Sequence, residues 1–168
     1  MPYATLEDTN REVTARHPAG VTLRLGSDAA AIRWLLSNVS GSPVVLEASI
    51  PEYRWGARVA KYTGLPAVLG WRWHQSQQRG TYAPAVDQRL RDVQTMFDDP
   101  TPARTLPLLA KYGVRYVYVG DLERAYYSGD GLAKFDRMTD VFKPVYQQDG
   151  VTIYEVTGDP GGAQAGRR

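Results

Sequence analysis

The feature of this sequence that most restricts its fold is the run Val114–Val119, which reads VRYVYV. Apart from Arg115 it contains only β-branched and aromatic residues, a composition that predicts a β-strand. Because side chains alternate along a strand, Tyr116 and Tyr118 should face one side of the sheet and the valines the other. Both faces would then carry large, mainly apolar groups. We therefore expect a central strand in a sheet that is covered by helices on both sides.

The rest of the chain alternates between helix and strand patterns. Helices are expected at 28–39, with Ser27 or Asp28 as the cap, in part of 51–63, and at 84–97, 102–112 and 131–138. Strands are expected at 21–25, 43–48, 67–69 and 114–119, with a hairpin of 142–147 and 151–156, whereas 75–83 has the composition of a loop. This order predicts an α/β fold, namely a three-layer sandwich with a mainly parallel sheet in Rossmann-like order and an antiparallel edge hairpin.

The length of 168 residues fits one domain of ordinary size. We expect a linker segment at 1–20, a single α/β domain at 21–157 and a disordered, glycine-rich tail at 158–168. No stretch approaches the roughly 18 consecutive apolar residues of a membrane-spanning helix, and the first ten residues lack the apolar core of a signal peptide. The chain itself is therefore expected to be soluble.

Composition excludes several kinds of chemistry. The chain has no cysteine, so it has no disulfide, thiolate metal site or cysteine nucleophile. Its formal net charge of +2 gives no reason to expect nucleic acid as a partner. There is no glycine-rich phosphate loop or G-x-S-x-G motif, and the two histidines, His17 and His74, lack the spacing of a metal site. We predict no catalytic residues, no metal and no cofactor for the chain alone.

Polar and aromatic side chains collect where the predicted strands end, and Tyr126 and Tyr127 also follow the VRYVYV strand. In an open parallel sheet the loops after the strands emerge on one edge, where ligands usually bind. Aromatic faces framed by charged groups suit a sugar or a peptide. In another reading these aromatics cap the core, or contact a membrane surface or a partner domain. The candidate ligand-binding residues, expected to converge on one concave surface, are Glu47, Tyr53, Trp55, Arg58, Trp71, His74, Arg79, Glu123 and Arg124.

The charged members of this group should pair, with Glu47 or Glu123 bonded to Arg58, Arg79 or Arg124. Residue types alone also allow a stand-alone hydrolase or transferase that uses Glu47, His74 and Glu123, provided that all three reach the same ligand. A third hypothesis is a purely structural interaction domain.

Several blocks occur in an order that suggests a family. They are AIRWL (31–35), PVVLEA (43–48), TGLPAVLGW (63–71), the segment from His74 to Gly80, YGVRYVYVGDLER (112–124), GLAKF (131–135) and VTIYEV (151–156). From about Tyr3 to Val156 the chain resembles the YYY membrane-protein family, although Gln75 and Gln78 replace a Glu and a Trp of the family's histidine segment. The resemblance implies the C-terminal, extracytoplasmic domain of a polytopic membrane protein related to GT-C type glycosyltransferases. The catalytic carboxylate of GT-C enzymes lies between membrane helices, so the resemblance implies an inactive fragment.

A weaker similarity points to the same class. Trp34-Leu35 and the run 108–119 (LLAKYGVRYVYV) are similar to the soluble domains of oligosaccharyltransferase catalytic subunits. The W-W-D-Y-G motif of those enzymes reads the acceptor peptide, and this chain has Glu47 and then Tyr53-Arg54-Trp55-Gly56 near the same place, without the Asp. The resemblance implies a domain that helps to bind an acceptor or to shape the active-site cleft. Its partners would be the transmembrane portion of its own parent protein and a saccharide or peptide acceptor.

Overall fold

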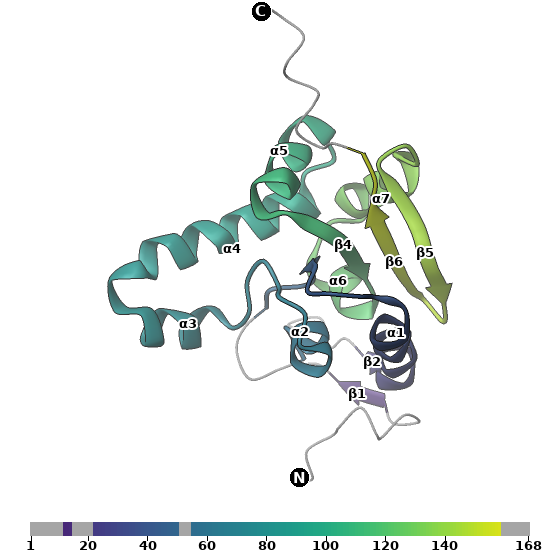
Figure 1. Cartoon of the computed structure of the whole chain (residues 1–168), viewed down its shortest axis with the longest axis horizontal. Coiled ribbons are helices and arrows are strands. Elements are labelled where there is room, and N and C mark those ends of the chain that lie inside the picture. Colours follow the sequence, from purple (N-terminus) through teal and green to yellow (C-terminus); the bar gives the residue numbers. More distant parts are fainter. Residues whose placement is uncertain (1–11, 15–21, 51–54, 159–168) are drawn as a thin grey trace, which may run out of the picture.

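The computed structural model describes residues 12–14, 22–50 and 55–158 (Figure 1). The helices are α1 (Leu25–Asn38), α2 (Arg58–Thr63), α3 (Arg72–Arg79), the 3-10 helix η1 (Gly80–Tyr82), α4 (Ala83–Asp98), α5 (Pro102–Tyr112), α6 (Asp121–Tyr126) and α7 (Gly129–Arg137). The strands are β1 (Glu12–Thr14), β2 (Thr22–Arg24), β3 (Val44–Leu46), β4 (Val114–Val119), β5 (Phe142–Gln148) and β6 (Val151–Val156).

The main sheet has the strand order β3-β4-β6-β5. β3 lies parallel to β4, whereas β6 is antiparallel to both β4 and β5. The α/β class and the edge hairpin are confirmed, but the prediction of a mainly parallel sheet is wrong. The tight turn after β5 reverses the chain, and β6 then inserts beside β4. The strand expected at 67–69 is reduced to a single parallel bridge between Val45 and Ala67.

Helices cover both faces of this sheet, as the central strand predicted. Tyr118 is buried in a cluster with residues of α1 and α2, and the half-buried Tyr116 packs against it. Val117 and Val119 point the other way, into a larger cluster with residues of α4, α5, α6 and α7. The expected division of β4 into a tyrosine face and a valine face is therefore confirmed.

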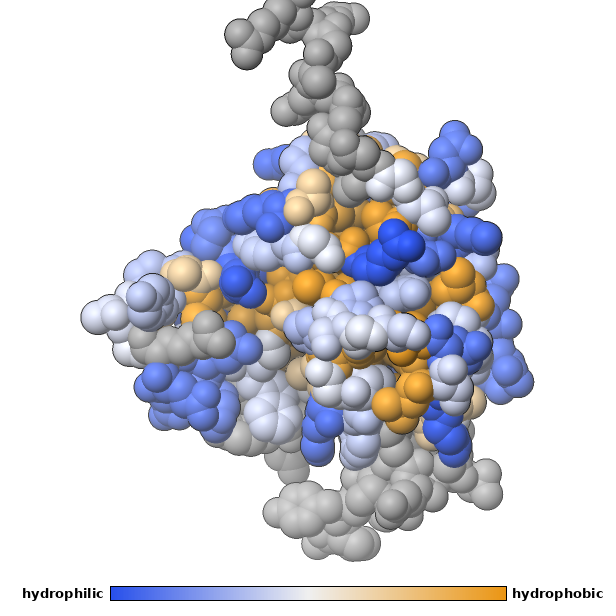
Figure 2. Space-filling model, viewed as in Figure 1, coloured by the Kyte–Doolittle hydropathy of each residue, from blue (hydrophilic) through white to orange (hydrophobic). Residues whose placement is uncertain are grey.

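The segment predicted as a loop at 75–83 is mostly helical. α3 and η1 occupy it, and α3 packs against α4. Figure 1 shows this helix pair projecting from the sheet, and Figure 2, in the same orientation, shows apolar residues between α4 and the sheet. α3 lacks a regular apolar face of its own, so its packing against α4 could not be read from its sequence.

Three further differences concern the ends of the predicted elements. α6 follows β4 directly, where no helix was expected. β1 lies within the predicted linker at 1–20 and pairs with β2. The predicted tail at 158–168 lies outside the described residues except for Gly158. Among the helices of the described residues, none has the length and apolar character needed to cross a membrane.

Candidate ligand-binding edge of the sheet

A buried arginine joins the segments that follow the two parallel strands. Arg58, in the first turn of α2, is only 1 % exposed. Its Nη1 and Nη2 atoms donate hydrogen bonds to Oε1 and Oε2 of Glu123 at 3.1 and 2.9 Å, and its Nε atom donates to Oδ2 of Asp28 at 2.8 Å. Of the pairings that were expected, between Glu47 or Glu123 and Arg58, Arg79 or Arg124, the structure contains that of Glu123 with Arg58. A two-bond arginine–carboxylate contact fixes geometry as well as charge.

Glu123 also holds the ends of both parallel strands. Its carboxylate accepts hydrogen bonds from the backbone N–H of Ala48 (2.9 Å), after β3, and from that of Gly120 (2.8 Å), after β4. Burial alone would raise the pKa of Glu123, but Arg58 and these two hydrogen bonds outweigh it and hold the pKa below its usual value. A Cβ atom at Gly120 would lie 3.0 Å from Nη2 of Arg58, so a glycine allows the arginine to approach this closely.

Tyr118 and Asp28 complete this buried network. The hydroxyl of Tyr118 donates to Oδ1 of Asp28 at 2.6 Å, and the guanidinium of Arg58 lies over the tyrosine ring at 4.8 Å. Ser27 or Asp28 was expected to cap α1. The helix instead begins at Leu25, and Asp28 uses its two oxygens on Arg58 and Tyr118. Sequence analysis missed this role because residues on four separate elements meet here.

Glu47 lies beside this network but has partners of its own. It is 2 % exposed, and its two oxygens accept the backbone N–H groups of Val59 and Ala60, each at 2.8 Å. These are donors of the first turn of α2, which have no partner within the helix. Burial raises the pKa of Glu47 to about 7, against the opposing effects of Arg58 and the two N–H groups.

Glu47 should make the stability of the protein depend on pH. Its pKa of about 7 in the folded state exceeds the ordinary value of 4.5, so the folded state binds more protons than the unfolded state between these values. Stability should therefore fall as the pH rises through this window, by up to about 3 kcal/mol from this residue. In Glu47→Gln that fall should disappear when urea unfolding is measured at pH 5 and at pH 8. Equal pH dependence in both proteins would contradict the assignment.

The chain leaving β3 forms one wall of a pocket. The hydroxyl of Tyr127 accepts from the backbone N–H of Ser49 at 3.0 Å and lies 3.2 Å from its carbonyl oxygen. The ring of Tyr127 stacks on Phe97 of α4, with 4.4 Å between the ring centroids. Ser49 is thus fixed from the side of α6 and α4, next to the Ala48 that Glu123 holds.

The pocket has a volume of about 440 Å³ and lies between the segment after β3, the end of α6 and the side of α4. The lining of this pocket combines aromatic and aliphatic side chains with an arginine, an amide and a carboxylate. Its lining residues are Ser49, Ile50, Arg72, Leu90, Gln94, Asp98, Tyr126 and Tyr127.

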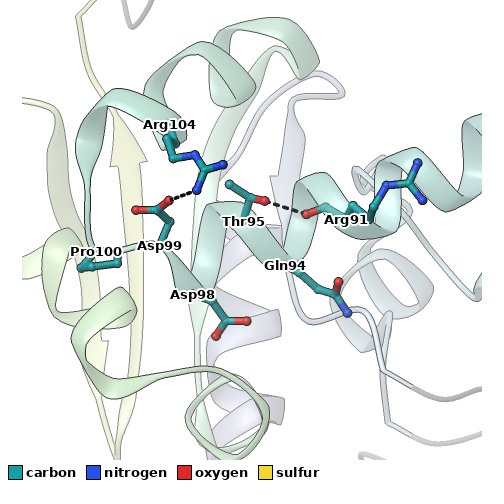
Figure 3. A pocket seen from close by; sticks show the side chains of 7 residues that line it. All are labelled: Arg91, Gln94, Thr95, Asp98, Asp99, Pro100 and Arg104. Atoms are coloured by element: carbon teal, nitrogen blue, oxygen red, sulfur yellow. Dashed lines mark hydrogen bonds and ion pairs between the residues drawn. The ribbon is translucent and has the colours of Figure 1, made fainter.

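A second, more open pocket of about 490 Å³ adjoins it at the end of α4 (Figure 3). Gln94 and Asp98 line both pockets. Figure 3 shows these two side chains pointing away from the ion pair between Arg104 and Asp99, which measures 3.1 Å. The shared wall is therefore polar and belongs to α4.

The predicted site residues fall into separate groups rather than on one concave surface. Glu47, Arg58 and Glu123 come together, but they are buried. Trp71 donates its indole N–H to the carbonyl of Gly56 at 3.1 Å, and Trp55 stacks on Tyr62 at 6.5 Å. These two tryptophans therefore help to hold the segment between β3 and α3.

The remaining predicted residues lie elsewhere. His74 is exposed on α3, where its Nε2 lies 2.9 Å from Nε2 of Gln78. Arg124 is exposed and donates to the carbonyl of Gly150 in the β5–β6 turn. Tyr53 and the side chain of Arg79 lie outside the described part of the structure.

The pocket lies at the edge of the sheet where sequence analysis expected a site, but most of the residues chosen for that site hold the structure. Tyr126 and Tyr127, noted only because they follow the VRYVYV strand, line the pocket, whereas Ser49, Gln94 and Asp98 were missed. Gln94 and Asp98 come from α4, whose position relative to the edge no local pattern indicates. Within residues 12–14, 22–50 and 55–158, no group of His, Asp or Glu side chains could hold a metal ion.

Comparisons with known proteins find similarity to solved structures but to no known family. No family model matches the chain, and no curated protein matches it significantly. Among solved structures it is similar to the C-terminal globular domain of an oligosaccharyltransferase from Archaeoglobus fulgidus, with a TM-score of 0.48 and 15 % sequence identity. The similarity covers 76 % of this chain and 95 % of that one. The YYY family assignment stays a prediction, and the activity of the archaeal enzyme is not transferred to this chain.

Proposed function

We propose that this chain is an acceptor-recognition domain of a larger, membrane-bound, glycosyltransferase-like protein, and that it lies on the extracytoplasmic side. It binds part of a saccharide or peptide acceptor and leaves the transfer step to the membrane portion of the protein. The observation that carries the proposal is the pocket of about 440 Å³ at the carboxyl ends of β3 and β4. The ordered sequence blocks that resemble the YYY family supply the membrane-bound context.

The chemistry of the pocket favours recognition of an uncharged, partly apolar ligand. Tyr126, Leu90 and Ile50 offer apolar surface, and the amide of Gln94 and the carboxylate of Asp98 offer hydrogen-bonding groups. Sugars and peptides both present apolar patches framed by polar groups, so they suit such a lining. The buried network around Arg58 contributes by holding the backbone at Ala48, directly before Ser49 in the pocket wall.

A stand-alone hydrolase fits less well. Glu47 and Glu123 are buried and bonded to backbone N–H groups or to Arg58, while His74 is exposed on α3. A common catalytic centre would need all three within reach of one bound ligand.

Titration of the labelled chain with neutral disaccharides and short uncharged peptides tests the recognition proposal. We expect chemical-shift changes at Ser49, Ile50, Gln94 and Tyr126 with at least one class of ligand. Gln94→Leu should weaken binding by about three- to tenfold, because it removes one hydrogen-bonding group from an exposed site. Gln147→Leu, the same change at another exposed glutamine, on β5, should have no effect. If no ligand shifts these signals, the domain is a structural interaction module instead.

A further inference from the structure

Two pockets meet along one side of α4. The first, of about 440 Å³, and the second, of about 490 Å³, have Gln94 and Asp98 as a shared wall. These two residues are four positions apart, so they lie one above the other on the helix. Figure 3 shows them pointing to the same side of α4. Both are exposed, and one ligand can therefore contact both pockets across this wall.

The α4 residues of the two pockets form a continuous strip along the helix. Leu90, Gln94 and Asp98 line the first pocket, and Arg91 and Thr95 join the same wall residues in the second. Because an α-helix rises by about 1.5 Å per residue, the strip from Leu90 to Asp98 is about 12 Å long. This length exceeds that of a single sugar ring or amino-acid side chain. We call the two pockets together the α4 groove.

The two halves of the α4 groove differ in chemistry. The first pocket offers apolar surface from Ile50, Leu90 and Tyr126. Of the described residues that line the second pocket, only Pro100 is apolar. All the others carry hydrogen-bonding groups, and they are Arg91, Gln94, Thr95, Asp98, Asp99 and Arg104.

The charges in the groove balance. Arg72 adds a positive charge to the first pocket, but it is paired with Asp87 at 2.6 Å. The second pocket has two positive and two negative side chains, namely Arg91, Arg104, Asp98 and Asp99. Neither an acidic nor a basic ligand is favoured by such a lining, whereas a neutral ligand that both donates and accepts hydrogen bonds finds partners of both kinds.

Several of these polar groups are held in place by the protein itself. Asp98 accepts the backbone N–H of Ser128 at 2.7 Å, and Nη2 of Arg91 donates to Oε1 of Gln88 at 2.6 Å. The hydroxyl of Thr95 donates to the carbonyl of Arg91 at 2.9 Å. Side chains that are already positioned lose less conformational freedom when a ligand binds.

We propose that the α4 groove binds a neutral oligosaccharide, with one sugar ring against the apolar surface of the first pocket and the next among the polar groups of the second. Sugar hydroxyls donate and accept hydrogen bonds without bringing a charge. A bound peptide commonly pairs with a strand edge or places its side chains in apolar pockets. None of the described lining residues belongs to a strand, and the second pocket is polar. The inference rests on the proposed acceptor-recognition function and narrows its ligand to a saccharide longer than one ring.

Titration of the isotope-labelled chain with neutral sugars of two lengths tests this assignment. Maltose and maltotetraose, and mannobiose and mannotetraose, are compared with an uncharged dipeptide and an uncharged hexapeptide. We expect a tetrasaccharide to bind at least about tenfold more tightly than the disaccharide of the same sugar, because it also reaches the second pocket. The disaccharide should shift the amide signals of Ser49 and Tyr126, and the tetrasaccharide should also shift those of Thr95 and Arg104.

Three leucine variants locate the binding. Arg91→Leu removes a donor from the second pocket alone, and it should weaken tetrasaccharide binding by about three- to tenfold and so narrow the difference between the two lengths. Gln94→Leu, in the shared wall, should weaken the binding of both lengths. Arg33→Leu is the matched control, because Arg33 is an exposed arginine of α1, which covers the opposite face of the sheet. That change should affect neither length.

The outcomes separate this inference from the recognition function on which it rests. Equal affinity for the two lengths, or shifts confined to the first pocket, would overturn the extended groove and leave the recognition function standing. Binding of peptides without binding of saccharides would overturn the saccharide assignment alone. If neither class of ligand shifts any signal of the groove, the recognition function fails together with the inference.

Discussion

Arg58→Met should lower the free energy of unfolding by about 3–5 kcal/mol. The guanidinium is the one cation of the buried network, and its removal leaves the carboxylates of Asp28 and Glu123 without a charged partner. Glu47 is buried next to them and gains no new partner. Methionine fills much of the same space, so the loss measured by urea unfolding reports on charge and hydrogen bonding rather than on a cavity.

The size of this effect should depend on pH. In the wild type, Arg58 keeps the pKa of Glu123 in the folded state below the ordinary pKa of a carboxyl group. The resulting stabilisation is complete at a pH above the ordinary pKa, and it is lost as the pH falls through the lowered pKa of the folded state. Without Arg58 the buried carboxyls should instead take up protons, so the loss of unfolding free energy in Arg58→Met should be smaller at pH 5 than at pH 8.

Arg115→Met is the matched control, because Arg115 pairs with Glu155 on the surface and its side chain is 54 % exposed. That change should cost no more than about 1 kcal/mol. Equal losses in the two variants would contradict a special role for the buried network.

The sequence was informative wherever a pattern is local. The composition of VRYVYV placed β4 in the centre of the sheet and assigned its two faces, because strand geometry alone fixes the alternation. Glu47 and Glu123 were expected at the strand ends, and their charge predicted a pairing with Arg58, Arg79 or Arg124, of which Glu123 with Arg58 is present. These predictions needed no knowledge of how distant segments pack.

The failures concern contacts between distant segments. Whether β5 or β6 lies next to β4 is decided by packing across the sheet, and no pattern in either strand indicates it. The polar sequence RWHQSQQR becomes helical because α4 lies alongside it and Asp87 binds Arg72. The pocket depends on α4 crossing the sheet edge, so Gln94 and Asp98 had no signal that could link them to Ser49.

Gly131→Ala should be destabilising by about 3 kcal/mol, because α7 approaches the end of α4 too closely for a side chain. A Cβ atom at Gly131 would lie 2.5 Å from the carbonyl oxygen of Asp98 and would also overlap the carbonyl oxygen of Phe97. The buried Lys134 fixes this contact by donating hydrogen bonds to the carbonyls of Phe97 and Gly131, at 3.2 and 2.8 Å. The backbone therefore has little freedom to move aside.

Gly129→Ala on the same helix is the matched control, since a Cβ atom there meets nothing within 4 Å. Alanine favours a helix over glycine, so this variant should equal the wild type or exceed its stability by up to about 1 kcal/mol. Urea unfolding of both variants measures the difference. The result also bears on the pocket, because Asp98 lies at this contact and accepts the backbone N–H of Ser128 at 2.7 Å. If Gly131→Ala were as stable as Gly129→Ala, α7 would lie farther from α4, and the position of Asp98 in the pocket wall would lose its structural basis.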